Sequence, residues 1–275
     1  PGLTAIYSLN NNALAGMFHK RIGLGAWLGP DGRERFEWPV RPLTMTIGLV
    51  LSRLARHEPF YDRLSRRERF AQPNRRLEDH DACDDRVRML DPSDSGDAAL
   101  IDSFGHAAAK AERASPLRTA DIYRFQMADP DAPGRTALLA AFSGDRIDGL
   151  CQLILSKPNA FEPLELVATD LVLHPEADRA ASLSALVRSA RTLARRSGAA
   201  RLRLPFTARF SKDDFADAPR PIRRQSRYDS AHGFFASGGH ALQEHWVPTG
   251  YESDFFFALR IPPSAHARGA GSERR

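Results

Sequence analysis

The sequence of 275 residues predicts an α+β fold in which helices flank one mixed sheet. The first observation is a hairpin, because the apolar runs Thr136–Phe142 and Ile147–Leu155 flank the turn Ser143-Gly-Asp-Arg146. The second is an amphipathic helix, in which apolar residues recur from Leu183 at helical spacing until Gly198. Strands before and after this helix complete an order of elements that is typical of mixed sheets.

The N-terminal part of the chain predicts a shorter series of elements. They are a strand over residues 3–8, a helix from Ala13 to about Ile22 that ends at Gly23, a strand near Arg35–Trp38 and a strand over Leu43–Leu51. The charged stretch over residues 53–85 is interpreted as a linker with helical character.

A second series begins at Arg86 and extends to about Ile261. Its expected elements are a strand at Val87–Leu90, a helix with Leu100, Ile101, Phe104 and Ala108 on one face, the hairpin, a strand at Leu164–Leu173, the amphipathic helix, a strand at Leu202–Phe206, and a last strand at Phe255–Leu259. Residues 262–275 are small and polar, which predicts a disordered tail.

Composition excludes several classes of protein. The two cysteines, Cys83 and Cys151, exclude a disulfide framework. No apolar stretch reaches the ~18–20 residues of a membrane span, and no signal pattern opens the chain, so a cytoplasmic protein is expected. The net charge of +5 is mild. Two arginine clusters, at residues 63–69 and 220–227, leave phosphate or nucleic-acid binding open without favouring it.

Two segments carry a resemblance to a known family. Val87-Arg-Met-Leu-Asp-Pro-Ser-Asp94 is similar to a first strand that runs into a first helix, and Ala168-Thr-Asp-Leu-Val-Leu-His-Pro-Glu176 is similar to a fourth strand that ends shortly before a proline. In these segments and in the order of its elements, the chain from Arg86 to Ile261 resembles the GNAT superfamily of N-acetyltransferases. The resemblance implies a central mixed sheet flanked by helices.

The resemblance also implies an acyl donor, acetyl-CoA or a longer acyl-CoA, and no metal. In the family, the end of the fourth strand binds pantetheine, and the next loop and helix N-terminus bind pyrophosphate, which agrees with the affinity of helix N-termini for anions. The matching residues are Leu171, Leu173, Arg179, Ala180, Ala181 and Ser182. The loop Glu176-Ala-Asp-Arg-Ala-Ala-Ser182 contains two acidic residues and no glycine. The alternative that this loop no longer binds CoA therefore stays open.

Amine acylation needs a base for the ammonium group and an acid for the leaving thiolate. In the family, a tyrosine on the fourth helix often acts as the acid. The spacing of that helix recurs at Asn12–Leu24, with His19 at the tyrosine position, and at Tyr228–Gly239, with Phe235 there. Each match is followed by an expected strand pair, over Arg35–Leu51 and over His240–Ile261. The resemblance therefore implies a set of candidate acids and bases, which are His19, Tyr228, Glu244, His245 and Tyr251, followed by His232, His240 and Glu252.

The repeated spacing predicts a tandem arrangement of two GNAT-like units. Residues 1–52 are interpreted as the C-terminal part of a truncated first unit, residues 53–85 as the linker, and residues 86–261 as a nearly complete acyltransferase domain. The alternative to a tandem arrangement, that a common strand-helix-hairpin pattern matches this spacing by accident, stays open.

These observations predict an N-acyltransferase that moves an acyl group from acyl-CoA to an amine by direct transfer. A catalytically silent GNAT-like binding or assembly module stays open because of the glycine-free loop and Phe235. An aminoacyl-tRNA-using transferase of the same fold stays open because of the arginine clusters. The expected partners are acyl-CoA and an amine substrate, and a homodimer stays open. The Glu78–Asp85 segment contains metal-ligand residue types, but consecutive carboxylates in a linker predict a solvated segment.

Overall fold

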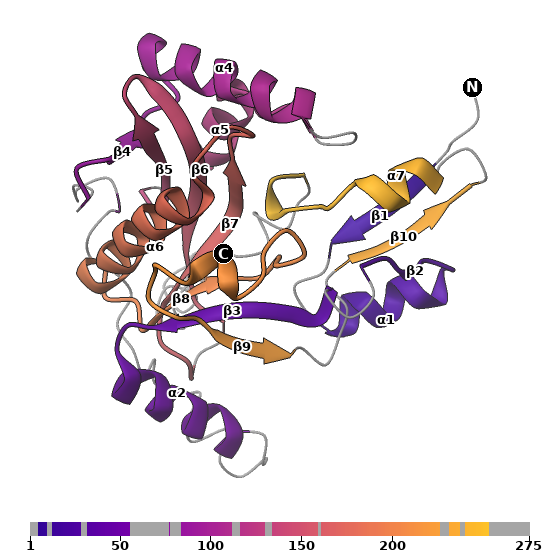
Figure 1. Ribbon diagram of the computed structural model, residues 1–275. Helices are drawn as coiled ribbons and strands as arrows, with labels where there is room; N and C mark the ends of the chain where they lie inside the picture. The colour runs from indigo at the N-terminus through magenta and orange to yellow at the C-terminus, as the bar shows by residue number, and fades with distance from the viewer. Residues whose placement is uncertain are drawn as a thin grey trace, which may run out of the picture.

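A seven-stranded mixed sheet forms the centre of the computed structural model, with strand order β4-β5-β6-β7-β8-β3-β9, and a three-stranded sheet of order β1-β10-β2 lies beside it (Figure 1). The structure describes residues 5–9, 13–28, 32–55, 77, 84–111, 116–129, 134–158, 161–225, 231–236 and 240–252. In chain order the elements are β1 (Ala5–Leu9), α1 (Ala13–Arg21), β2 (Gly25–Ala26), β3 (Glu34–Pro39), α2 (Pro42–Leu54), β4 (Val87–Leu90), α4 (Ser95–Ala111), α5 (Ala120–Met127), β5 (Thr136–Ser143), β6 (Arg146–Ser156), β7 (Glu165–Leu173), α6 (Arg179–Arg196), β8 (Arg201–Leu204), β9 (Ile222–Gln225), β10 (Ala231–Phe235) and α7 (His240–His245). No described helix is both long and apolar enough to cross a membrane.

The predicted hairpin is confirmed as β5 and β6, which pair antiparallel around a turn where Gly144 has a φ of 60°. Both faces of these strands are buried, and successive residues alternate between two cores. Leu139 and Leu153 pack on the side of α6, whereas Leu138 and Leu150 pack on the side of α4 and α5. The sheet is therefore a central layer between helices, as expected.

The predicted amphipathic helix is confirmed as α6. In its apolar stripe, Leu183, Leu186 and Leu193 are at most 3% exposed. The helix ends before Gly198, whose φ of 86° suits a glycine that closes a helix. It connects β7 to β8, and these two strands run parallel. This β7–α6–β8 crossover places the N-terminus of α6 beside the end of β7.

The expected strand over Leu43–Leu51 is wrong, because this segment is helix α2. Pro42 occupies the first helical turn, where its missing N–H costs nothing. Leu43, Ile47 and Val50 recur at helical spacing and are 82%, 54% and 50% exposed. The apolar content of the segment suggested a buried strand, but its period is that of a helix with an apolar face in solvent.

The C-terminal part of the domain also differs from expectation. The helical spacing at Tyr228–Gly239 is not realised, because Ala231–Phe235 forms strand β10 between β1 and β2. Gly233 leaves room for the Phe235 ring, since a Cβ there would lie 2.6 Å from the ring's Cε2 atom. The expected strand pair over His240–Ile261 is wrong over its first part, which is helix α7. Residues 253–261, with the expected last strand, lie outside the described residues.

The expected boundary near residue 52 does not separate two folded units. Strand β3 lies between β8 and β9 in the central sheet, and β10 lies between β1 and β2 (Figure 1). Strands from both sides of the boundary therefore pair with each other, and the tandem origin stays a prediction. Within the expected linker, Leu77 is fully buried in the core on the α6 side. The rest of that linker between residues 56 and 83 and the tail over 262–275 lie outside the described residues.

Candidate functional site

A cleft of about 350 Å³ lies where β7 and β8 separate. Its described lining comes from the end of β7, the start of α6, the segment after β8, and the end of α7 with the segment after it. It comprises Leu171, Val172, Leu173, Arg179, Arg209, Phe210, His245 and Val247. This volume is within the range of small-molecule sites, about 300–1,000 Å³. Three of the expected cofactor residues and one expected catalytic residue therefore line a single cleft.

The wall formed by β7 offers backbone hydrogen-bonding groups. The parallel pairing of β7 with β8 ends at Val167 and Arg203, although β7 continues to Leu173. The His174 N–H donates to the Asp148 carbonyl on the β6 side. Because successive residues of a strand point their backbone groups to opposite sides, those of Leu173 and Leu171 point away from β6, toward the cleft. This edge can therefore bind an extended chain that carries amides.

The N-terminus of α6 forms the adjacent wall. Asp178 caps the helix, and its carboxylate accepts a hydrogen bond of 3.0 Å from the Ala181 N–H. Ala180 and Ala181 are half-buried in the first turn, and Ser182 is 4% exposed. The cap stabilises the start of the helix and places a carboxylate at its positive end.

Arg179 is held in place at the mouth of the cleft. Its guanidinium forms an ion pair of 2.6 Å with Asp214, donates to the Arg209 carbonyl at 2.6 Å, and lies 5.1 Å from the centre of the Phe210 ring. Burial opposes the ionisation of Asp214, but the bonds from Arg179 and Ser211 outweigh it and lower the pKa of that carboxyl. The Asp214 carboxylate is therefore ionised at neutral pH and neutralises Arg179.

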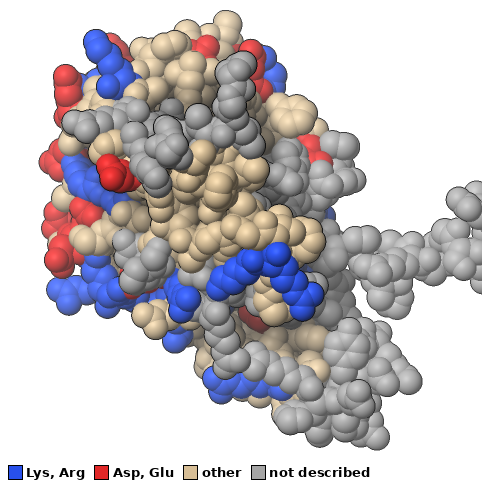
Figure 2. Space-filling view, turned by 90° about the vertical axis from the view of Figure 1, so that its right-hand side faces the viewer, with Lys and Arg blue, Asp and Glu red and all other residues tan. Residues whose placement is uncertain are grey.

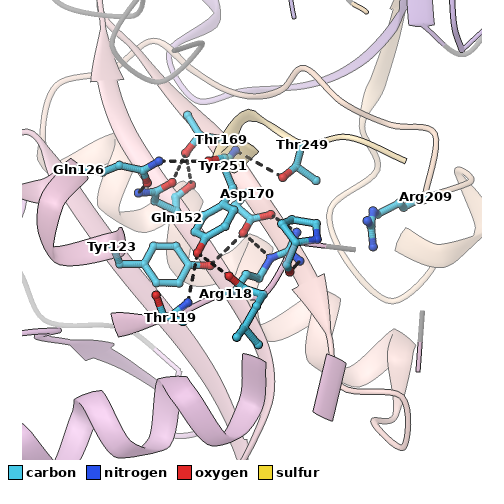
Figure 3. A network of polar contacts seen from close by, with 12 residues as sticks. Arg118, Thr119, Tyr123, Gln126, Gln152, Thr169, Asp170, Arg209, Thr249 and Tyr251 are labelled. Atoms are coloured by element: carbon cyan, nitrogen blue, oxygen red, sulfur yellow. Dashed lines mark hydrogen bonds and ion pairs between the residues drawn. The ribbon is translucent and has the colours of Figure 1, made fainter. Parts of the chain in front are cut away.

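A buried polar network supports the β7 wall from behind (Figure 3). Asp170, next to Leu171, forms an ion pair of 2.7 Å with Arg118, and both side chains are at most 1% exposed. The Tyr123 hydroxyl donates to the same carboxylate at 2.9 Å. Burial opposes the ionisation of Asp170, but Arg118 and the hydroxyl donors hold its pKa below the usual range. The network joins the segment before α5 to β7.

The structure separates the expected catalytic residues. His245 lines the cleft, and Glu244 beside it is exposed and is not part of the lining. Tyr251 is 4% exposed, and its hydroxyl donates to the Leu117 carbonyl and accepts from the Thr119 N–H (Figure 3). Burial raises the pKa of Tyr251 to about 12, and both backbone bonds hold its hydroxyl in the network. Its expected catalytic role stays a prediction.

The remaining candidates lie elsewhere or outside the description. His19 is on α1, and its ring centre is 5.8 Å from that of His232 on β10, in the three-stranded sheet. Tyr228 lies outside the described residues. The roles expected for these residues stay predictions.

Among the residues that sequence reasoning missed are Arg209 and Phe210, which line the cleft, and the buried Arg118. All three lie in irregular segments, where no periodic pattern marks which side chains face inward.

The arginine cluster at residues 220–227 contains cations that are paired with acidic side chains. Arg223 pairs with Glu34 and Arg224 with Glu37, so in the described part of that cluster these cations already have acidic partners. On the described part of the face in Figure 2, basic and acidic side chains are interspersed along the left edge, and further basic side chains lie across the middle and the lower part.

No protein-family model matches the sequence, and no curated protein does. Among solved structures, a probable acetyltransferase has a TM-score of 0.33 at 20% identity, over 43% of this chain and 77% of that chain. A probable N-acyltransferase from Enterococcus faecalis V583 has a TM-score of 0.43 at 9% identity, over 85% of this chain and 45% of that chain. N-myristoyltransferase from Saccharomyces cerevisiae, solved with bound myristoyl-CoA, has a TM-score of 0.42 at 9% identity, over 74% of this chain and 50% of that chain. The chain thus spans half or less of the length of the last two.

The fold itself rests on the strand pairing of this chain. Strands β4 to β7 are antiparallel neighbours, β7 and β8 are parallel, and α6 crosses between them. This is the order of elements that the sequence resemblance implies, with the β7 edge exposed at the separation of β7 and β8. The chain has a GNAT-like α+β fold.

Proposed function

We propose that this protein is an N-acyltransferase that moves an acyl group from a pantetheine thioester, such as an acyl-CoA, to an amine. The observation that carries the proposal is the edge of β7, where the backbone groups of Leu171 and Leu173 point into a cleft of about 350 Å³. A pantetheine arm contains two amides in an extended chain, so it can hydrogen-bond to such an edge as an added strand would.

In the proposed reaction the amine nitrogen attacks the carbonyl carbon of the thioester. A C–N bond forms, the C–S bond breaks, and the thiolate leaves and takes a proton from solvent. His245, which lines the cleft, accepts the proton that the amine loses. Binding both reactants in one cleft supplies the orientation on which direct transfer depends.

The first test is titration of acetyl-CoA and a long-chain acyl-CoA into the full chain by calorimetry, with Leu173→Pro and Leu173→Ala as a matched pair. Both variants shorten the side chain, but only proline removes the N–H that points to the cleft. Because that N–H lies away from β6, the sheet pairing is retained. We expect about tenfold weaker binding for Leu173→Pro and less than about threefold for Leu173→Ala.

A second test measures turnover with a panel of amines for the wild type and His245→Gln. A base role predicts that the acidic limb of the pH–rate profile disappears in the variant while donor binding is unchanged. Donor binding without turnover of any amine would support a catalytically silent binding module instead. Absence of donor binding in the wild type would refute the proposal.

A further inference from the structure

The N-terminal end of α6 already holds an anion of its own chain. The Asp178 carboxylate accepts from the Ala181 N–H at 3.0 Å, and the Asp178 carbonyl accepts from the Ser182 N–H at 2.9 Å. A diphosphate bound at this helix end would need the same kind of backbone donor. A carboxylate that caps the helix therefore competes with a phosphate for the first turn.

The cations near this helix end have other acceptors, which are the Ala181 carbonyl for Arg86, at 3.2 Å, and the Val247 carbonyl for Arg209, at 2.8 Å. Arg179 is paired with Asp214 through contacts of 2.6 Å and 3.3 Å and donates a third hydrogen bond to the Arg209 carbonyl. Arg146 is paired with Glu176 at 2.7 Å. Within the described residues, no lysine or arginine forms an ion pair with Asp178. A diphosphate at this position would therefore be repelled by the Asp178 carboxylate, whose charge is offset by the helix N-terminus rather than by a paired cation.

The β7 edge shows no such conflict. It offers backbone donors and acceptors to a neutral amide chain, and Leu171, Leu173 and Phe210 give the cleft an apolar part beside Arg179 and Arg209. The donor site thus has one half that suits a pantetheine thioester and one half that disfavours the diphosphate of CoA.

We propose that the acyl donor is recognised through its pantetheine arm and acyl group alone, and that Asp178 excludes a diphosphate from the N-terminus of α6. This inference rests on the proposed acyltransferase function and states which class of donor the site takes. Any acyl-pantetheine thioester is a donor, and the nucleotide part of CoA adds no affinity.

The test compares the dissociation constants of acetyl-CoA and acetyl-pantetheine for the full chain by calorimetry. We expect the two values to agree within about threefold. Asp178→Asn keeps the capping oxygen but removes the charge, because asparagine caps helices as well as aspartate does. We expect this variant to bind acetyl-CoA about fivefold more tightly and acetyl-pantetheine unchanged.

Asp121→Asn is the matched control. Asp121 is also an exposed carboxylate in the first turn of a helix, but it belongs to α5, whose residues do not line the cleft. It is expected to change neither constant, and thermal unfolding verifies that both variants fold. Acetyl-CoA binding more than about tenfold tighter than acetyl-pantetheine, or no gain with Asp178→Asn, overturns this inference alone. If neither ligand binds, the proposed function fails and this inference fails with it.

Discussion

Asp170→Asn is expected to destabilise the protein more than any exposed charge change, because it leaves Arg118 charged and buried. The Asp170 carboxylate accepts from Arg118 at 2.7 and 3.1 Å and from the Tyr123 hydroxyl at 2.9 Å. The Arg118 side chain is 0% exposed, so water cannot replace these bonds. Removing one partner of a buried pair costs about 3–5 kcal/mol. That is a large part of a typical free energy of unfolding, about 5–15 kcal/mol.

The assay is urea unfolding followed by tryptophan fluorescence, with thermal unfolding in parallel. At about 2–4 °C for each kcal/mol, the melting temperature falls by about 10 °C. Arg118→Met/Asp170→Asn removes the uncompensated cation, so its loss of stability is expected to be smaller than the sum of the two single losses. Asp121→Asn, in an exposed pair with Arg124, is expected to cost less than about 1 kcal/mol.

Two results would refute this reasoning. One is a loss below about 1 kcal/mol for Asp170→Asn, which would mean that the buried arginine finds another partner or water. The other is additivity of the single variants within about 0.5 kcal/mol, which would mean that the two side chains are not coupled.

Three further predictions concern pH, packing and thiol chemistry. Burial opposes ionisation of Glu165, but neighbouring arginines outweigh it and lower its pKa. Ionised Glu165 therefore stabilises the protein above the ordinary pKa of a glutamate, and this stabilisation is lost as the pH falls through the lowered pKa. The melting temperature should decline in acid, and the decline should be smaller in Glu165→Gln. Gly105→Ala should cost about 2 kcal/mol or more by urea unfolding, because its Cβ would overlap the Arg118 carbonyl oxygen. The Cys151 thiol is buried, and burial raises its pKa, so in a Cys83→Ser variant it should react with a disulfide reagent only after unfolding.

Where the sequence pattern is periodic, the elements it predicts are present. The hairpin follows from two continuous apolar runs that flank a turn, and α6 follows from an apolar repeat of about 3.6 residues, which reflects which side chains are buried. The run Leu43–Leu51 was misinterpreted because its apolar content outweighed its helical period, and Ala231–Phe235 because a spacing match cannot show which strands lie nearby. Pairing partners far apart in the chain, such as β3 and β8, leave no local signal.

For the candidate site as well, the sequence predicted some features and the tertiary structure decided others. The amino-acid sequence by itself determined the β7–α6–β8 unit, since local periodicity specifies each element, and it marked Leu171, Leu173 and Arg179 through the family resemblance. Only the tertiary structure decided that His245 joins them and that Tyr251 is held in a buried network. These outcomes depend on contacts between irregular segments, whose side-chain directions are set by packing rather than by any repeat in the chain.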